Sequence, residues 1–244
     1  MPKIFGLTGG IAMGKSTLAA KLRWAGRRTG LMLWLHDADR AVRALMAPDG
    51  SAYQPIVALF GDITVAGAGT ALDRMKLGTA VFARPELRVQ LESILHPLVY
   101  GRTRQFLARA ARLRVPAVVL DIPLLFETNG ETRCDRIVSM AVAPAIQRRR
   151  ALARPGMTEK KFLGIVRAQV GAQTRIKHAD TVINSGAGVA FAYRHLLRAL
   201  ASSGVPKRFI AGRRQYTGLS QAWPPRHRRH GYWSRSYGKR CDYG

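Results

Sequence analysis

The sequence contains few cysteines and no long apolar segments. Its two cysteines, Cys134 and Cys241, are too few for a disulfide framework in a chain of 244 residues and indicate a reducing compartment. No apolar run approaches the roughly 18–20 residues of a membrane-spanning helix. The first residues also lack the charged and apolar regions of a signal peptide. We therefore expect a globular protein of the cytoplasm without a membrane partner.

Acidic residues are scarce as well. The chain has 14 Asp and Glu against 40 Lys and Arg, which gives a formal net charge of +26. Such a surplus can attract nucleic acid or an anionic membrane surface. The alternative is an arginine-rich composition with a basic tail, on an enzyme whose substrates are polyanions. We favour the alternative because the part expected to fold has no platform of interleaved aromatic and basic residues.

One motif is prominent near the start of the chain. Residues 9–17 read Gly-Gly-Ile-Ala-Met-Gly-Lys-Ser-Thr, which contains the phosphate-binding pattern G-x-x-x-x-G-K-S. The apolar segment 3–8 has strand character, and a helical pattern begins at Lys15. The motif therefore lies at a strand-to-helix turn, which is the context that its function requires.

The chemistry of this loop follows from its residue types. Glycines let several backbone N–H groups approach one phosphate at a helix N-terminus, where the dipole also favours negative charge. Lys15 supplies a positive charge for the β- and γ-phosphates, and the Ser16 hydroxyl is placed to bind Mg²⁺. Ala12 stands where a glycine would be expected. If this position needs a positive φ, alanine costs on the order of 1 kcal/mol.

A second parallel strand is predicted over residues 31–35, an apolar run that would be covered on both faces. It would bring His36, Asp37 and Asp39 to the carboxyl end of the sheet, where open α/β sheets bind ligands. A carboxylate opposite a phosphate-binding loop suits a general base or Mg²⁺. Asp39 is also a good N-cap for a helix beginning at Arg40, and the two roles can coexist.

Residues 40–110 are predicted to be mostly helical, because their apolar residues recur at helical spacing. Glycines between residues 61 and 69 indicate a loop. One helix is expected to end at His96-Pro97, because a residue before proline avoids the α region. On sequence grounds alone, His96 favours a structural role.

The third predicted strand, residues 116–121, is an aliphatic run that ends in Asp121. In the Walker B pattern, such a carboxylate reaches Mg²⁺, often through water. The residues that follow, Ile-Pro-Leu-Leu-Phe-Glu at 122–127, form either a substrate-facing wall or part of the core. Further strands are predicted over 135–142 and 179–186, before a closing helix over 191–200.

Two arginines after the fourth strand suggest a lid. Arg150 and Arg154 are four residues apart and share one helical face. A mobile helix that closes these side chains over ATP would stabilise the transferring phosphoryl group. A solvated basic face is the alternative. Thr158 is predicted to cap the next helix.

Together these segments resemble the dephospho-coenzyme A kinase family over about residues 3–200. The run Asp121–Glu127 is far more specific than the phosphate-binding loop alone. The matching segments, in chain order, are Gly6–Thr17, Asp37–Asp39, Leu72–Arg74, His96-Pro97, Asp121–Glu127, Gln147 with Arg150 and Arg154, Gln169, Ala179-Asp180, and Asn184 with Gly186.

The resemblance implies an α/β fold of the P-loop NTPase type within residues 1–204. Its three layers would surround a parallel sheet, with a helical substrate subdomain at about 40–110 and a lid at about 145–175. It also implies that ATP and Mg²⁺ phosphorylate the 3′-hydroxyl of the ribose of dephospho-CoA, the last step of coenzyme A synthesis.

Site residues follow from the resemblance position by position. Asp39 would be the base, with Lys15 and Arg150 as the other catalytic residues. Mg²⁺ would be bound by Ser16 and Asp121. ATP would be bound by Gly9, Gly10, Ala12, Met13, Gly14, Lys15, Ser16, Thr17, Arg150, Arg154 and Asn184. The acceptor would be bound by Asp37, Asp39, Arg74, His96 and Leu124.

Several features depart from the family pattern. Ala12 replaces a family glycine, and Asn184 replaces a frequent Asp. The link over residues 27–36 is several residues longer than usual, so the second strand could be shifted. Residues 205–244 match nothing in the family. They are rich in Arg, Gly, Tyr and Trp and are predicted to form a disordered basic tail that could contact RNA.

Two other functions remain open. The first is a P-loop kinase that acts on another nucleotide or alcohol. The second is a nucleic-acid-binding protein that uses ATP as a switch. This last reading leaves Asp37–Asp39 and Pro123–Glu127 without a role. The pattern does not predict an oligomeric state.

Overall fold

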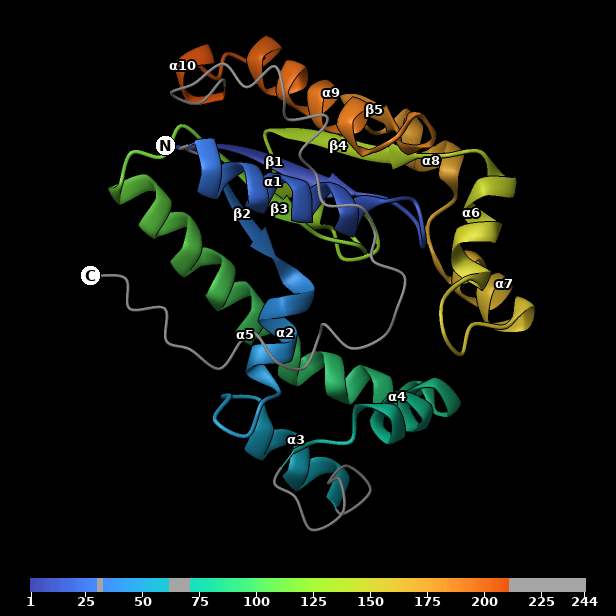
Figure 1. Ribbon diagram of the computed structural model, residues 1–244. Helices are drawn as coiled ribbons and strands as arrows, with labels where there is room; N and C mark the ends of the chain where they lie inside the picture. Colours follow the sequence, from blue (N-terminus) through green and yellow to red (C-terminus); the bar gives the residue numbers. More distant parts are fainter. Residues whose placement is uncertain (30–32, 62–70, 211–244) are drawn as a thin grey trace.

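The computed structural model describes residues 1–29, 33–61 and 71–210 (Figure 1). Among these residues, no helix is both long enough and apolar enough to cross a bilayer. The elements in chain order are β1 (Lys3–Thr8), α1 (Lys15–Thr29), β2 (Leu33–Asp37), α2 (Ala38–Leu45), α3 (Tyr53–Phe60), α4 (Arg74–Ala83), α5 (Pro85–Arg112), β3 (Ala117–Asp121), η2 (Gly130–Arg133), β4 (Arg136–Ala141), α6 (Pro144–Leu152), α7 (Glu159–Ala168), α8 (Ala172–Lys177), β5 (Thr181–Asn184), η3 (Ser185–Ala187), α9 (Val189–Ser202) and α10 (Lys207–Ile210).

The strands form one 5-stranded sheet in the order β2-β3-β1-β4-β5. All four strand pairings are parallel, which confirms the predicted parallel sheet. In a parallel sheet the carboxyl ends of the strands share one edge, and ligands bind in the crevice outside that edge. The phosphate-binding loop follows β1 there, and the segments with Asp39 and Pro123 follow β2 and β3.

Side-chain alternation along the strands explains the three layers seen in Figure 1. Phe5, Leu7 and Val119 pack with apolar residues of α1 and α9 on one face. Ile4 and Val118 belong to a second cluster with Phe106 and Leu107 of α5, on the other face. Because helices cover both faces, the central strands β1 and β3 are apolar over most of their length, as their sequences predicted.

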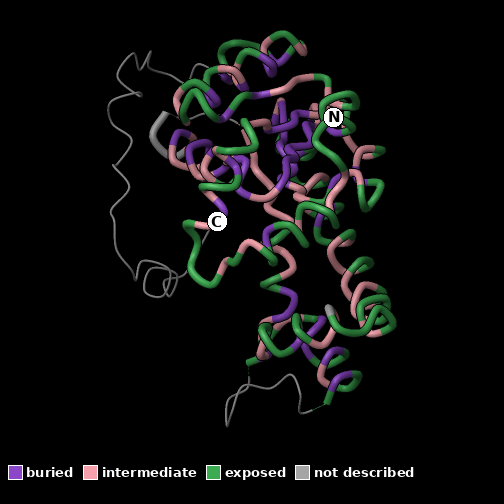
Figure 2. The backbone as a smooth tube through the Cα atoms, turned by 90° about the vertical axis from the view of Figure 1, so that its right-hand side faces the viewer, coloured by how far each residue is buried: buried purple, intermediate pink, exposed green. Residues whose placement is uncertain are grey.

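A separate apolar core holds the helical region together. It contains buried residues from α2, α3 and α4, among them Leu45, Ile56 and Leu77, with side chains from the first half of α5 packed against them. In Figure 2 this region forms the lower part of the molecule, and several of its positions are coloured as buried. The predicted helical character of residues 40–110 is therefore confirmed for the described residues.

The predicted helix end at Pro97 is wrong, because α5 runs through it. Proline inside a helix lacks the N–H that would bond the carbonyl four residues earlier, at a typical cost of about 3 kcal/mol. Apolar side chains on both sides, such as Leu95 and Leu98, pack against the helical core and favour continuation. In Figure 1 the two halves of α5 run in different directions, as expected for a helix kinked at proline.

Two predicted boundaries also move. Strand β2 ends at Asp37, two residues later than predicted, while residues 31 and 32 of the predicted strand lie outside the described part. The structured chain also continues past residue 204. Val205 and Ile210 are buried in the main core against the end of α9, because apolar side chains there cover the sheet-packed helix. The rest of the predicted tail, 211–244, lies outside the described residues.

Candidate active site

The phosphate-binding loop joins β1 to α1 and uses its glycines in two ways. Gly9 and Gly14 have positive φ values of 154° and 89°. A Cβ on Gly9 would also lie 2.8 Å from the Cβ of Met140. Side chains are therefore excluded at Gly9 by space and disfavoured at Gly14 by conformation, which keeps the loop backbone open to a phosphate.

Ala12 does adopt the positive φ that the sequence raised as a concern. Its φ is 59°, in the left-handed region that costs a non-glycine residue about 1–2 kcal/mol. Its methyl group is buried in a small cluster with Ala151 of α6 and Phe162 of α7. This packing offsets part of the strain and attaches the loop to the predicted lid.

Lys15 and Asp121 form an ion pair beneath the loop. The Lys15 ammonium lies 2.7 Å from Oδ1 of Asp121, and both side chains are buried. Burial raises the pKa of Asp121, the Lys15 ammonium opposes that rise, and the negative charges of Asp37 and Asp39 add to it. The carboxylates predicted from two separate segments therefore lie close enough to act on one another, and Asp121 among them pairs with the lysine of the loop.

The helix cap predicted at Asp39 is instead formed by Asp37. The N-cap of α2 is Asp37, whose Oδ1 accepts a hydrogen bond of 2.9 Å from the Arg40 N–H. Its Oδ2 pairs with Arg23 at 3.3 Å. Asp39 lies in the first turn and lines the cavity. The prediction that Asp39 is the cap is wrong, because β2 ends later and Asp37 takes the flanking position.

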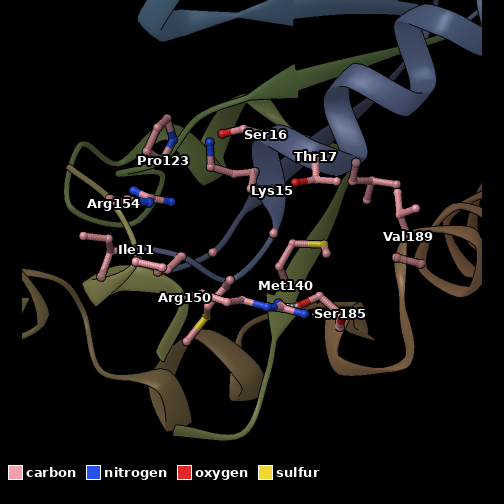
Figure 3. Close-up of a pocket in the computed structure, with 18 of the residues that line it drawn as sticks. Ile11, Lys15, Ser16, Thr17, Pro123, Met140, Arg150, Arg154, Ser185 and Val189 are labelled. Carbon is pink, nitrogen blue, oxygen red and sulfur yellow. Dashed lines mark hydrogen bonds between the residues drawn. The ribbon is translucent and has the colours of Figure 1, made fainter. Parts of the chain in front are cut away.

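One cavity of about 970 Å³ collects the loop, the lid and Asp39 (Figure 3). Every residue from Gly9 to Thr17 lines it, as does Pro123 at the end of β3. Arg149, Arg150 and Arg154 line it from α6 and its C-terminal end. Another part of the wall is formed by residues of the last part of the fold, namely Ser185, Gly188, Val189 and Ala192.

Arg150 is held across the cavity by Ser185. Its Nη1 donates to the Ser185 hydroxyl at 2.9 Å, and its Nη2 donates to the Ser185 carbonyl at 3.1 Å. A Cβ on Gly14 would lie 3.8 Å from Nη1, so the guanidinium lies beside the loop as well. In Figure 3 Arg150 reaches toward Ser185 while Lys15, Ser16 and Thr17 come from the start of α1.

Two glutamines fasten the loop to the lid through Ile11. The Ile11 N–H donates to Oε1 of Gln169 at 3.0 Å. The Nε2 of Gln147, on α6, donates to the Ile11 carbonyl at 2.9 Å. Both backbone polar groups of one loop residue are thus satisfied by side chains from the predicted lid.

Six predicted site residues do not line the cavity. Two of them, Asp37 and Asp121, are engaged by the contacts described above, and the other four lie elsewhere. Asn184 caps the following turn, where its Oδ1 accepts from the Gly186 N–H at 2.8 Å. Arg74 begins α4, His96 lies inside α5, and Leu124 follows β3 with 38% of its surface exposed. All four are exposed.

The sequence analysis did not identify several residues that line the cavity. Arg149 is one of three consecutive arginines, and helical phase separates them: Arg149 and Arg150 line the cavity, while Arg148 pairs with Glu159 of α7 at 2.7 Å. A helical projection would have given this result. Met140, Val189 and Ala192 carried no signal, because apolar residues at the ends of buried elements look like ordinary core.

These features define a class of protein. The sheet is parallel, with a phosphate-binding loop after β1 and a buried lysine in that loop. Arginines of α6 and the carboxylate of Asp39 line the same cavity, and together these are the parts of a P-loop kinase. The family model described as dephospho-CoA kinase matches residues 3–190. The chain belongs to the dephospho-CoA kinase family, and ATP is its phosphate donor.

Individual relatives agree with this assignment. The dephospho-CoA kinase of Rhodospirillum rubrum is 41% identical over 215 residues, covering 87% of this chain and 98% of the relative. That of Paramagnetospirillum magneticum is 48% identical over 169 residues, covering 69% of this chain and 75% of the relative.

Solved structures agree on the fold. The crystal structure of TT1252 from Thermus thermophilus has a TM-score of 0.70 and 32% identity, covering 84% of this chain and 99% of that one. Dephospho-CoA kinase from Campylobacter jejuni has a TM-score of 0.60 over 83% of this chain and 98% of that one; its 19% identity makes it evidence for the fold alone.

Proposed function

We propose that Asp39 is the base when this kinase transfers the γ-phosphate of ATP to the 3′-hydroxyl of the ribose of dephospho-CoA. The observation that supports this most is the shared cavity, in which Asp39 lies with the whole phosphate-binding loop and three arginines. Both carboxylate oxygens of Asp37 are already engaged, by the Arg40 N–H and by Arg23. Asp39 is the better candidate to accept the proton of an incoming hydroxyl.

The loop and the lid arginines supply charge to the triphosphate. Backbone N–H groups of residues 9–17 would hold the β-phosphate, and Lys15 would reach the β- and γ-phosphates. Arg150 and Arg154 approach from the other side of the cavity. In this arrangement positive groups surround the transferring phosphoryl group, so most of the catalysis comes from positioning and electrostatics.

The residues around Lys15 also fit Mg²⁺. Within the described residues, no group of three or more His, Cys, Asp or Glu could form a metal cage. Kinases do not need one, because Mg²⁺ is held by one or two protein oxygens together with phosphate oxygens and water. Ser16 lines the cavity and Asp121 is adjacent through Lys15, so these two would supply the protein oxygens. The ion offsets negative charge on the phosphates when it is bound.

The acceptor is proposed to contact three of the remaining predicted residues. Arg74, His96 and Leu124 are all exposed, although none lines the cavity. An exposed leucine directly after β3 suits contact with the apolar part of a large acceptor, and an exposed arginine suits its phosphates.

A coupled ADP-release assay tests the proposal. The purified chain with ATP and Mg²⁺ should turn over with dephospho-CoA and show only background rates with adenosine, AMP or RNA. Faster turnover with another nucleotide would favour the wider class of P-loop kinases. ATP hydrolysis that only RNA stimulates would favour the ATP-switched nucleic-acid-binding alternative.

A further inference from the structure

The reaction described above makes no use of Arg175, a residue of α8 that lies against the phosphate-binding loop. Its side chain is buried, with 5% of the residue exposed. One guanidinium nitrogen, Nη1, donates to the carbonyl of Val170. The other, Nη2, lies 3.9 Å from Sδ of Met13, inside the loop.

The guanidinium also contacts the loop at Gly10. A Cβ on Gly10 would lie 2.9 Å from Nη2 of Arg175 and 3.3 Å from Oε1 of Gln169. Gly10 and Met13 both line the cavity proposed for ATP, whereas Arg175 does not. The guanidinium therefore supports the loop from a side that the cavity does not reach.

The charge of Arg175 has little compensation from the protein. Within the described residues, no carboxylate lies within salt-bridge distance of its guanidinium. Glu127 is near, but its Oε1 accepts the Val170 N–H at 2.7 Å. Burial lowers the pKa of Arg175, and the Glu127 carboxylate opposes this. An unpaired buried charge is costly in a protein unless something else balances it.

We propose that Arg175 is a positioning residue for the triphosphate, acting through Gly10 and Met13 without touching the nucleotide. It holds the first half of the loop in place, and its positive charge behind the loop is balanced by the phosphates in front of it. The inference rests on ATP as the ligand of this cavity. It predicts that Arg175 affects the binding of nucleotides that carry phosphates and leaves adenosine unaffected, which a role in packing alone does not.

Direct binding measurements on the full chain test this, with adenosine, ADP and ATP as probes. Arg175→Met keeps the length of the side chain and removes the charge, and Arg175→Lys keeps the charge. Lys177→Met is the matched control, because it removes an exposed charge from the same helix. We expect Arg175→Met to weaken ADP and ATP by about tenfold, as removal of one favourable charge interaction does, while adenosine binds as before. Arg175→Lys should recover most of the affinity, and Lys177→Met should match the parent.

Two outcomes would overturn the proposal. One is an equal loss for adenosine, ADP and ATP, which would indicate packing alone. The other is a folded Arg175→Lys that binds adenosine normally but loses ATP as far as Arg175→Met; this variant also decides the question if Arg175→Met does not fold. A parent chain that binds no ATP would instead contradict the proposed function, so the two failures are distinguishable.

Discussion

At the scale of single residues, the two aspartates at the junction of β2 and α2 have different roles, one structural and one chemical. Asp37 is held by the Arg40 N–H and by Arg23, whereas Asp39 lines the cavity. We expect Asp39→Asn to lower kcat by about 10²–10⁴-fold, the usual contribution of a general base. ATP affinity, measured by titration, should stay close to that of the parent.

Asp37→Asn is the control for that substitution. Asparagine caps a helix about as well as aspartate, so only the partly exposed ion pair with Arg23 is lost, a loss of about 1 kcal/mol or less. Its kcat should remain close to the parental value. Full activity in Asp39→Asn would remove that residue as the base.

Ala12 is a second residue whose substitution has opposing effects on stability. Ala12→Gly relieves strain of about 1–2 kcal/mol, but it loses a buried methyl group worth about 0.8 kcal/mol and loosens the unfolded chain by about 0.4–1 kcal/mol. We therefore expect kcat to be held and the Tm to change little.

Arg114→Gly is the matched case. Arg114 also has a positive φ, of 51°, but its side chain is exposed at the end of α5. Without a buried methyl group to lose, this variant should gain stability. A large loss of activity in Ala12→Gly would show that the contact between the loop and the lid requires the methyl group.

At the scale of elements, Gln147 and Gln169 connect the lid to the loop through opposite hydrogen bonds. Gln169 accepts from Ile11, so Gln169→Glu keeps the bond. Gln147 donates to Ile11, so Gln147→Glu removes it and leaves a carbonyl unsatisfied, at a cost of about 1–3 kcal/mol. Thermal unfolding without nucleotide should therefore show a lower Tm for Gln147→Glu only. Equal shifts would mean that the added charge, rather than the bond, decides stability.

The packing of β2 on α5 predicts a pH dependence. Nε2 of His36 lies 3.1 Å from Oγ1 of Thr103, and the imidazole ring packs at a tilt against Phe106, with the ring centroids 5.0 Å apart. Burial lowers the pKa of His36, and Asp37 partly opposes this. The unfolded chain therefore takes up the proton first as pH falls below about 6.5, and the free energy of unfolding decreases from there down to the folded pKa.

His36→Gln provides the comparison, because glutamine keeps a donor for Thr103 but does not titrate. Chemical unfolding between pH 7.5 and 5 should show a steeper loss of stability for the parent than for the variant. Parallel curves would mean that His36 does not contribute to the pH dependence.

At the scale of the whole molecule, the end of the folded part can be tested by truncation. The family match ends at residue 190, and the buried residues described last are Val205 and Ile210. A chain ending at Ile210 should keep parental kcat and Tm. A chain ending at Pro206 loses the burial of Ile210, worth about 1.5–3 kcal/mol, and its Tm should fall by several degrees. Loss of activity in a folded 1–210 chain would assign a catalytic role to the segment after residue 210.

The structural features that could be predicted from the sequence are those set by residues close to one another along the chain. The strands and the phosphate-binding loop were readable because apolar runs and glycine spacing act within a few residues. The passage of α5 through Pro97 was not, because packing against α2–α4 overrides a local preference. The two hydrogen bonds between Ile11 and the side chains of Gln147 and Gln169 join residues more than 130 positions apart in the sequence. No local pattern could therefore predict them.

The position of β1 in the sheet has a consequence for biosynthesis. β1 pairs only with β3 and β4 among the described strands, and its register with them spans Ala117–Asp121 and Arg136–Ser139. Because β1 is synthesised before both of its neighbours, it must wait for them, about 7–30 s at common translation rates. During that interval ATP cannot stabilise the nascent chain, because the loop that binds the nucleotide is not yet supported by a formed sheet.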